Sequence, residues 1–348
     1  MKARENFFKH LHPHSIRDRT LDPLSTLGLG IVCMTCLLLL AATGLTLLLY
    51  YVPHQDVAYD RILHIMTTLR YGKVIRNLHY LAANVLIIAG ILHLARVFFT
   101  AGYKGRWLNW IYGLFLLGLI FFSNYTGYLL PWDQTSYWAI KVGANLTTYF
   151  PGVGPSLKNF LLGGEEIGPE TLIRCFGLHI AVLPFLWTIL TSLHLWRIRK
   201  DGGLAAPEEG KPVRLPSSPS LYRAELAVGL LTLTLLFSLS LFVGAPLSDR
   251  ADPLHPPNPA KAPWFFVGIQ EMLSHSATLG GVVIPALIGL FLVFSPAIDR
   301  SKETGGRWFG KERLTLNLVF ALIFLGQLFM IFVGQWFRTR NWGLKFPW

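Results

Sequence analysis

Four histidines lie within the long apolar stretches of this chain. His79 and His93 are fourteen residues apart on one stretch, and His179 and His194 are fifteen apart on another. An ionisable side chain in a lipid-facing segment is costly, so it usually marks a functional site. Pairs of neutral imidazoles suit the two axial positions of haem iron, and no Asp, Glu or Cys lies beside them to complete a zinc or di-iron site. These residues therefore predict haem sites.

The spacing of the histidines sets the geometry of these sites. Fourteen residues at about 100° each return a helix to within about 40° of its starting face and advance it by about 21 Å. His79 and His93 should thus face the same way at two depths. On the other stretch Pro184 lies between the two histidines, and a proline kink there would absorb the extra residue of register. Two facing helices would then pair His79 with His179 and His93 with His194.

Four glycines repeat the fourteen-residue spacing. They are Gly30 with Gly44 and Gly113 with Gly127. A missing side chain lets a flat macrocycle lie against a helix backbone. The alternative is that the glycines are ordinary small residues at helix contacts and that the histidines are buried polar groups bonded across helices. Four histidines and four glycines in matching register favour haem binding.

The composition is that of an integral membrane protein. The chain is 52% hydrophobic and only 14% charged. Segments of about twenty apolar residues span a bilayer as helices, because backbone groups in lipid must be satisfied internally. The first twenty residues are charged and lack the apolar core of a cleavable signal, so we expect none. The fold class is therefore all-α, with seven transmembrane helices of which the first four form a di-haem bundle. The predicted spans are 26–50, 77–99, 107–130, 172–196, 224–243, 279–298 and 314–337.

The basic residues predict the orientation. Seven crossings place the N-terminus and three connections on one side, and that side carries more Lys and Arg than the other. The positive-inside rule then puts the N-terminus in the cytoplasm, with His79 and His179 toward the outer side of the membrane. The net charge of +12 is explained by these anchors and anionic lipid, so we expect no nucleic-acid partner.

The chain divides after the fourth span. Residues 201–222 are polar and rich in Pro and Gly, which predicts a surface linker between a di-haem domain (1–200) and a three-helix domain (223–348). Three cysteines are too few for a disulfide framework. Cys33 and Cys36 have CxxC spacing but lie inside a span, and Cys175 has no companion, so all three are interpreted as small buried thiols.

At this point three runs of residues resemble the cytochrome b subunit of quinol:cytochrome c oxidoreductases. The fifteen-residue His spacing and the LPWDQ run are closer to the short cytochrome b of photosynthetic and Gram-positive complexes than to the mitochondrial form. Residues 223–348 resemble the separate three-helix subunit of that group, here joined to the four-helix part. The three runs are 76–97, 126–134 and 179–200.

The resemblance implies a bifurcating mechanism. A quinol bound near the outer haem would give one electron to a Rieske iron-sulfur protein, and the second would pass through two non-covalent b-type haems to a quinone on the cytoplasmic side. A c-type cytochrome, the quinone pool with menaquinone as one candidate, membrane lipid and a second copy of the complex are the implied partners. A di-haem membrane anchor of another quinone-linked dehydrogenase or reductase is the alternative function.

Two departures from the family bear on the sites. Pro263 stands where the Pro-Glu-Trp-Tyr motif of the outer quinol site carries its proton-accepting glutamate. Glu271, seven residues after Trp264, would return to nearly the same face of a helix, so it is the candidate acceptor; the alternative is an interfacial glutamate exposed to water. Gly28 stands where a cysteine holds an extra haem in the photosynthetic group, so a covalent third haem is not expected.

The remaining candidates lie near the two ends of the histidine spans. Arg76, Arg96 and Arg174 could pair with haem propionates, or else snorkel as helix-end residues. Glu225, at the cytoplasmic start of the fifth span, could relay protons to an inner quinone site or cap its helix. A flat quinol needs apolar walls, although aromatic residues here could equally form an interfacial belt. The expected walls are Tyr125, Tyr128, Pro131, Tyr137, Pro263, Trp264, Phe265 and Phe266.

Overall fold

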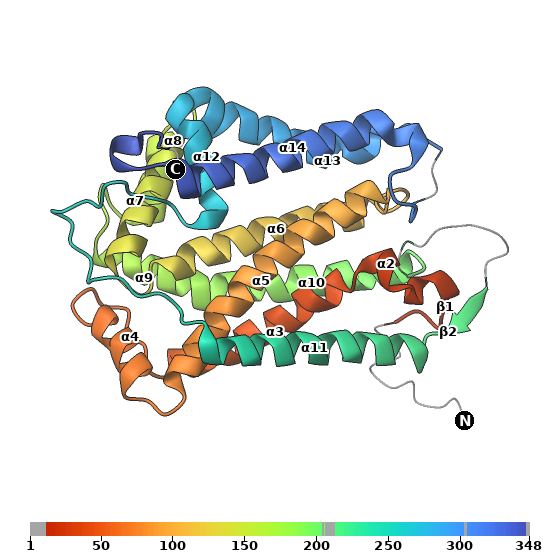
Figure 1. The fold of residues 1–348 in the computed structure, drawn as a ribbon, viewed down its shortest axis with the longest axis horizontal. Coiled ribbons are helices and arrows are strands. Elements are labelled where there is room, and N and C mark those ends of the chain that lie inside the picture. The colour runs from red at the N-terminus through yellow and green to blue at the C-terminus, as the bar shows by residue number, and fades with distance from the viewer. Residues whose placement is uncertain (1–11, 204, 206–212, 303–304, 346–348) are drawn as a thin grey trace.

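The computed structural model describes residues 12–203, 205, 213–302 and 305–345 (Figure 1). Within these residues seven helices are long and apolar enough to cross a membrane, which confirms the all-α transmembrane fold. Each span agrees with its predicted range to within a few residues. The spans are α3 (Leu29–Leu48), α5 (Gly72–Phe99), α6 (Trp107–Tyr128), α9 to α10 (Pro169–Lys200), α11 (Ser220–Phe242), η3 to α13 (Leu279–Ile298) and η4 to α14 and η5 (Lys311–Phe337).

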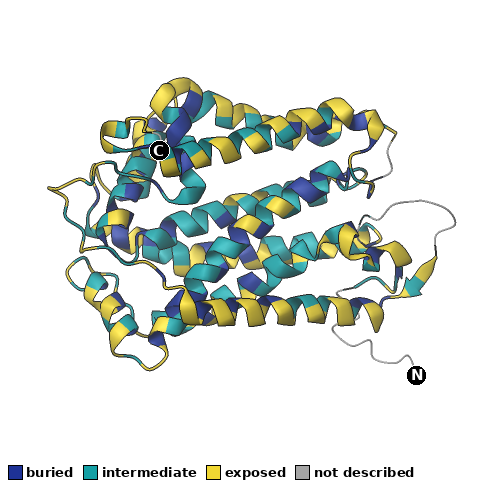
Figure 2. Ribbon diagram, in the orientation of Figure 1, coloured by how far each residue is buried: buried dark blue, intermediate teal, exposed yellow. Residues whose placement is uncertain are grey.

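The outward faces of the spans are apolar. Leu230 and Phe237 of α11 are exposed, and so are Leu322 and Phe329 of α14. Figure 2 shows exposed residues along the outer sides of the helices, with buried residues toward the middle. A soluble protein of this size would rarely expose so much contiguous apolar surface, so these faces are suited to lipid.

Four spans form the central bundle. Helix α3 packs along α5, and α10 packs along α6. The bundle interior holds a buried apolar cluster to which α3, α5, α6, α10 and α11 all contribute. The three C-terminal spans do not pack as a unit of their own: α11 lies against α3 and α5, whereas α13 and α14 lie beyond α6 on the opposite edge (Figure 1).

The fourth span contains a π-helix, η2 (Leu178–Val182), which includes His179. At its end the Leu183 N–H donates to the Leu178 carbonyl, five residues back. Pro184 follows directly and has no N–H to offer the carbonyl four residues back, which favours the wider turn. The extra residue of register is therefore absorbed by a π turn before Pro184, and the expected proline kink is corrected in this respect. A second π-helix, η3 (Leu279–Val283), likewise precedes a proline at the start of α13 (Ile284–Ile298).

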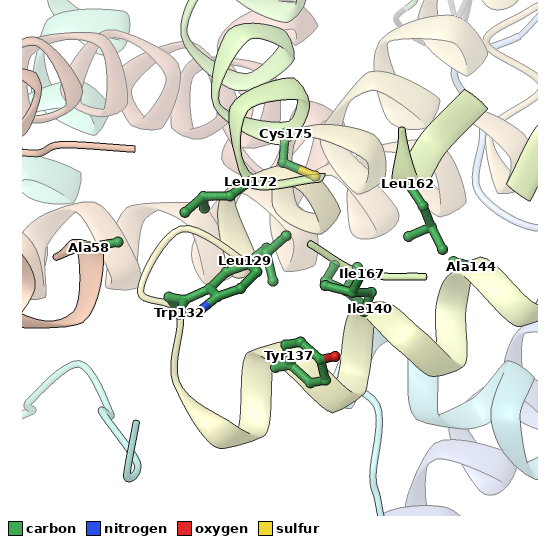
Figure 3. Packing of buried hydrophobic residues seen from close by; sticks show 10 residues of the cluster. All are labelled: Ala58, Leu129, Trp132, Tyr137, Ile140, Ala144, Leu162, Ile167, Leu172 and Cys175. Atoms are coloured by element: carbon green, nitrogen blue, oxygen red, sulfur yellow. The ribbon is translucent and has the colours of Figure 1, made fainter. Parts of the chain in front are cut away.

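Short elements mark the two ends of the bundle (Figure 1). Helices α4 (Ala58–Thr67), α7 (Gln134–Thr147), α8 (Gly154–Leu162) and α12 (Trp264–His275) lie at one end, called the outer end below. At the inner end β1 (Ser15–Arg17) pairs antiparallel with β2 (Arg214–Pro216), beside α2 (Pro23–Thr26). A buried apolar cluster between α7 and α9 contains Leu129, Trp132, Tyr137, Leu172 and Cys175, as Figure 3 shows.

The connection from α11 to α12, called the E–F connection below, is held along the outer end by hydrogen bonds. Arg76, at the start of α5, donates to the carbonyls of Ala245 and Pro246 at 2.8 and 2.7 Å. The Asp133 carboxylate, which caps α7, also accepts from the Ser248 N–H at 2.9 Å. These bonds fix the path of residues 244–263 across the bundle.

A buried ionic cluster ties the inner ends of α5, α13 and α14 together. The side chains of Asp299 and Arg313 are fully buried, with Arg313 Nε 2.6 Å from Asp299 Oδ2. Lys104 Nζ lies 2.9 Å from Asp299 Oδ1, and the Tyr103 hydroxyl donates to Oδ2 at 2.8 Å. Because every charge in the cluster is paired, its burial is tolerated. The start of the connection after α13 and the start of α14 are thereby held against the connection between α5 and α6.

Candidate functional site

The two outer histidines face each other across the bundle. The ring centroids of His79 in α5 and His179 in η2 are 6.3 Å apart, with an interplanar angle of 67°. Metal–imidazole bonds of about 2 Å, with each ring centre about 1.2 Å beyond its nitrogen, would place two opposed ligands about 6.4 Å apart. The separation therefore fits a single metal ion held between the two rings.

Hydrogen bonds orient both outer rings. The Thr43 hydroxyl donates its proton to the Leu39 carbonyl at 2.7 Å, so at 2.9 Å from His79 Nδ1 it can only accept. His179 Nδ1 lies 3.0 Å from the Ser123 carbonyl, which is also only an acceptor. Both Nδ1 atoms therefore carry the proton, and both Nε2 lone pairs are left for a metal.

Each of the four glycines lies against one of the four histidines. A Cβ built on Gly44 would lie 3.3 Å from His79 Cε1, and one built on Gly127 would overlap the His179 ring. At the inner level a Cβ on Gly30 or Gly113 would lie 3.7 Å from Cε1 of its partner histidine. The glycines thus leave room for the imidazoles as well as for a macrocycle, which extends the role expected from their spacing.

The inner pair lines one cavity. His93 and His194 face this cavity together with Gly113 and Asn109. Within the described residues, the buried His93 Nδ1 and the Asn109 side-chain oxygen have no hydrogen-bond partner, while His194 lies beside the Asn109 backbone. Buried polar atoms without partners are rare in native proteins, so this cavity fits a bound polar group.

The three predicted arginines lie in different settings. Arg76 is 8% exposed at the outer end and bonds the E–F connection, as described above. Arg96 lines the inner cavity, is 5% exposed, and donates to the Ser25 and Ala205 carbonyls at 2.8 and 3.0 Å. Arg174 is exposed and donates to the Phe160 carbonyl of α8 at 2.7 Å. Arg106, which the sequence reasoning missed, also lines the inner cavity; its place directly before a span is the signal that could have found it.

Part of the expected quinol wall is assembled between α6 and α12. Phe266 lies 6.0 Å from Phe121 and 6.1 Å from Tyr125 between ring centroids, and Phe265 lies 6.4 Å from Phe121. A Cβ on Gly143 would lie 2.6 Å from the Tyr125 ring, so this glycine of α7, absent from the sequence prediction, admits the tyrosine.

The other wall candidates lie around this aromatic group. Trp264 turns toward α5 and donates to Asn84 Oδ1 at 2.6 Å. Tyr137 of α7 is buried in the cluster between α7 and α9 (Figure 3). Tyr128 ends α6 and is partly buried, as is Pro131 in the turn that follows, and Pro263 directly precedes α12.

Glu271 is not free to act as the expected proton acceptor. It is 1% exposed and lies on the face of α12 toward α14, where Arg338 donates to both of its oxygens. Trp342 Nε1 and His275 Nε2 each lie 3.1 Å from the carboxylate. Burial alone would raise the pKa of Glu271, but the hydrogen bonds and charge of Arg338, with those of His275 and Trp342, outweigh it and lower the pKa. The expectation that Glu271 shares the quinol-facing side is therefore corrected: the face seven residues on from Trp264 turns to the C-terminal segment.

Glu225 has a partner from the N-terminal segment. His12 Nε2 lies 2.7 Å from Glu225 Oε2, and both side chains are partly buried. Val228, about one turn along α11 from Glu225, contacts Gly28. Gly28 is two residues before Gly30, which lies against His93. The His12–Glu225 pair is therefore at nearly the same depth as the inner histidines.

Comparison with known proteins places the chain in a family. A family model described as cytochrome b/b6/petB matches residues 23–202. Cytochrome b6 of Acaryochloris marina (strain MBIC 11017) is 39% identical over 175 residues, which are 50% of this chain and 81% of that protein. Cytochrome b of Micropechis ikaheca is 30% identical over 280 residues, 79% of this chain and 75% of that protein. The chain belongs to the cytochrome b/b6 family.

The fold extends the match beyond the family model. A solved chain of a hyperthermophilic respiratory Complex III superimposes with a TM-score of 0.78 over 89% of this cytochrome b and 84% of that chain, at 24% identity, which shows a shared fold. Family membership makes the chain a haem-binding membrane protein of electron transport, and it confirms the resemblance drawn from the sequence motifs.

Proposed function

We propose that this cytochrome b is the quinol-oxidising, proton-translocating subunit of a quinol:cytochrome c oxidoreductase. The observation that carries the proposal is the aromatic wall of Tyr125, Phe265 and Phe266 beside the outer histidine level. Tyr125 is two residues from Gly127, which lies against His179. A flat apolar substrate bound at this wall would therefore lie next to the outer haem, as electron transfer requires.

Two b-type haems would be held by His79 with His179 and by His93 with His194. When bound, they supply one-electron transfer across the membrane. The Nδ1 bonds of the outer rings would leave the Nε2 lone pairs to hold the outer haem. Arg96 and Arg106 at the inner cavity would face the haem propionates, and Arg76 would do so at the outer end.

The outer site is built from two parts of the chain that must stay together. Gln134 accepts from the Asp252 N–H at 2.7 Å, and its own side-chain N–H donates to the His255 carbonyl at 2.6 Å. These bonds dock the E–F connection onto the segment after α6. A simple di-haem anchor would not need this docking, so it favours quinol oxidation over the anchor function.

At the inner side, the His12–Glu225 pair is our candidate proton relay to a reducible quinone. Glu225→Gln should slow quinone reduction at the inner site without altering haem content. Glu225 lies in the second turn of α11 and does not cap it, so unchanged quinone reduction would leave Glu225 only its structural contact with His12.

The partners and location follow from the proposed reaction. They are a Rieske iron-sulfur protein, a c-type cytochrome and a quinone such as menaquinone, with two copies of the complex in a bacterial cytoplasmic membrane and the N-terminus in the cytoplasm.

The proposed function is tested by the quinol:cytochrome c activity of the purified complex. Activity that depends on an intact Tyr125–Phe266 wall, and is lost in Phe266→Ala with both haem spectra retained, would support the proposal; haem reduction without any quinol oxidation would contradict it.

A further inference from the structure

The back of helix α12 is held by the C-terminal segment that follows the last span. The Glu271 carboxylate accepts from Arg338 Nε at 2.8 Å through Oε2, and from Arg338 Nη2 through Oε1. Trp342 Nε1 donates to Oε2 at 3.1 Å, and His275 lies 3.1 Å from Oε1. The carboxylate is thus surrounded by donors and is suited to stay ionised in the folded protein.

Arg338 also organises its own segment. Its Nη1 donates to the Trp342 carbonyl at 2.8 Å, and this bond closes the turn of residues 338–342. Asn341 and Asn258 exchange two hydrogen bonds of 2.7 Å, and Lys261 Nζ donates to the Gln335 carbonyl at 2.7 Å. The segment therefore fastens the end of α14 (Leu314–Phe332) both to α12 and to the E–F connection.

Close packing makes α12 sensitive to this contact. A Cβ built on Gly268 would lie 2.9 Å from the Ile331 side chain, and one built on Gly334 would lie 3.0 Å from Val267. The face of α12 opposite to these contacts carries Phe265 and Phe266, which pack against α6. Because the packing behind α12 leaves little free space, we expect a displacement of Glu271 to move α12 and, with it, the aromatic wall.

We propose that Arg338 is a positioning residue for the outer quinol site: its ion pair with Glu271 fixes α12 so that the Phe265–Phe266 wall keeps its place against α6. This rests on the proposed function. The competing role, in which the Glu271 carboxylate takes a proton from quinol, requires a free carboxylate oxygen facing the wall, whereas its oxygens are engaged on the far side of the helix.

Removing one or both of the paired charges distinguishes the positioning role from the proton-acceptor role. Removing one partner of a buried ion pair leaves an unpaired buried charge, whereas removing both leaves none. A positioning pair should therefore tolerate the double substitution better than either single one. A proton acceptor should not, because the double variant still lacks the carboxylate.

The experiment compares Glu271→Gln, Arg338→Gln and the double variant in the whole complex, with haem spectra as the check on integrity. The exposed Arg340, two residues along the same segment, supplies the control Arg340→Gln. We expect each single variant to raise KM for quinol about tenfold with kcat less affected and the pH profile unshifted, and the double variant to return to within about twofold of the parent. Arg340→Gln should match the parent.

Two results would overturn the inference. One is a double variant as slow as Glu271→Gln with a shifted pH profile, which would make the carboxylate a proton acceptor. The other is a parental KM in Arg338→Gln. Failure of the proposed function is seen separately, because the parental complex itself would then oxidise no quinol.

Discussion

His79 and His179 reach toward one another from two helices with their ring centroids 6.3 Å apart and their Nδ1 atoms bonded away from the gap. The two histidines therefore do not use Nδ1 to hydrogen-bond each other. With Nδ1 of each ring bonded to the protein, both Nε2 atoms are left to bind a metal, and we propose that this pair would hold the iron of the outer haem.

Gly127→Ala should remove the outer haem. The new Cβ would overlap the His179 ring, so the ligand must move. We expect haem content to fall by roughly half, with the outer-haem signal lost from the redox-difference spectrum. Gly118→Ala on the same helix is the matched control, since nothing lies within 4 Å of its Cβ position. Full haem content in Gly127→Ala would show that the ring is not held where the structure has it.

Thr43→Val should shift the midpoint potential of the outer haem without removing it. The Thr43 oxygen accepts the proton of His79 Nδ1, a bond that makes the ligand more basic and favours the oxidised iron. Its loss should raise the potential by roughly tens of millivolts. A redox titration measures this, with Thr46→Val, whose exposed hydroxyl bonds only the Ala42 carbonyl among the described residues, as control. A potential equal to the parent's would argue against the bond.

Asp299→Asn should destabilise the inner end of the bundle. It leaves the buried Arg313 without its carboxylate, which typically costs about 3–5 kcal/mol. Burial alone would raise the pKa of Asp299, but the hydrogen bonds of Ser301, Lys104, Tyr103 and Arg313 lower it well below its usual range. The stabilisation is therefore present above about pH 4, the unfolded value, and is lost only as the pH falls toward the folded pKa.

Thermal unfolding in detergent at pH 7 measures the cost of Asp299→Asn. The double variant Asp299→Asn/Arg313→Met should recover part of the loss, because no unpaired charge remains. A parental unfolding temperature in the single variant would contradict the pairing.

The orientation prediction can be checked with reporter fusions. A cytoplasm-active reporter inserted in the 201–213 connection should be active, and one fused after residue 348 should be inactive. The reverse pattern would invert the proposed outer and inner sites together.

The sequence predicted the spans and the histidine pairing well because both depend on local signals. Apolar length defines a span, and the 3.6-residue period fixes which residues share a face. The glycine spacing of Gly113 and Gly127 carried the same information, since each has its histidine partner at the matching depth. The start of α5 at Gly72, five residues before its predicted start, was missed because Lys73 and Arg76 interrupt the apolar run.

Contacts between distant segments could not be predicted in this way. Glu271 and Arg338 are 67 residues apart, and no periodic pattern links them. The helical period places Glu271 two turns after Trp264, but Trp264 bonds Asn84 of α5 whereas Glu271 bonds Arg338, because different neighbours pack against the two ends of α12. The π turn at His179 was likewise hidden, since Pro184 signals a disrupted helix without saying whether it kinks or widens.

The central claim is that this cytochrome b holds two haems between its four intramembrane histidines. A pyridine haemochrome assay on the purified complex, normalised to the chain, tests it most directly. We predict two b-type haems per chain, with His93→Leu losing the inner one and keeping much of the outer one. A parental protein without b-type haem would contradict the account.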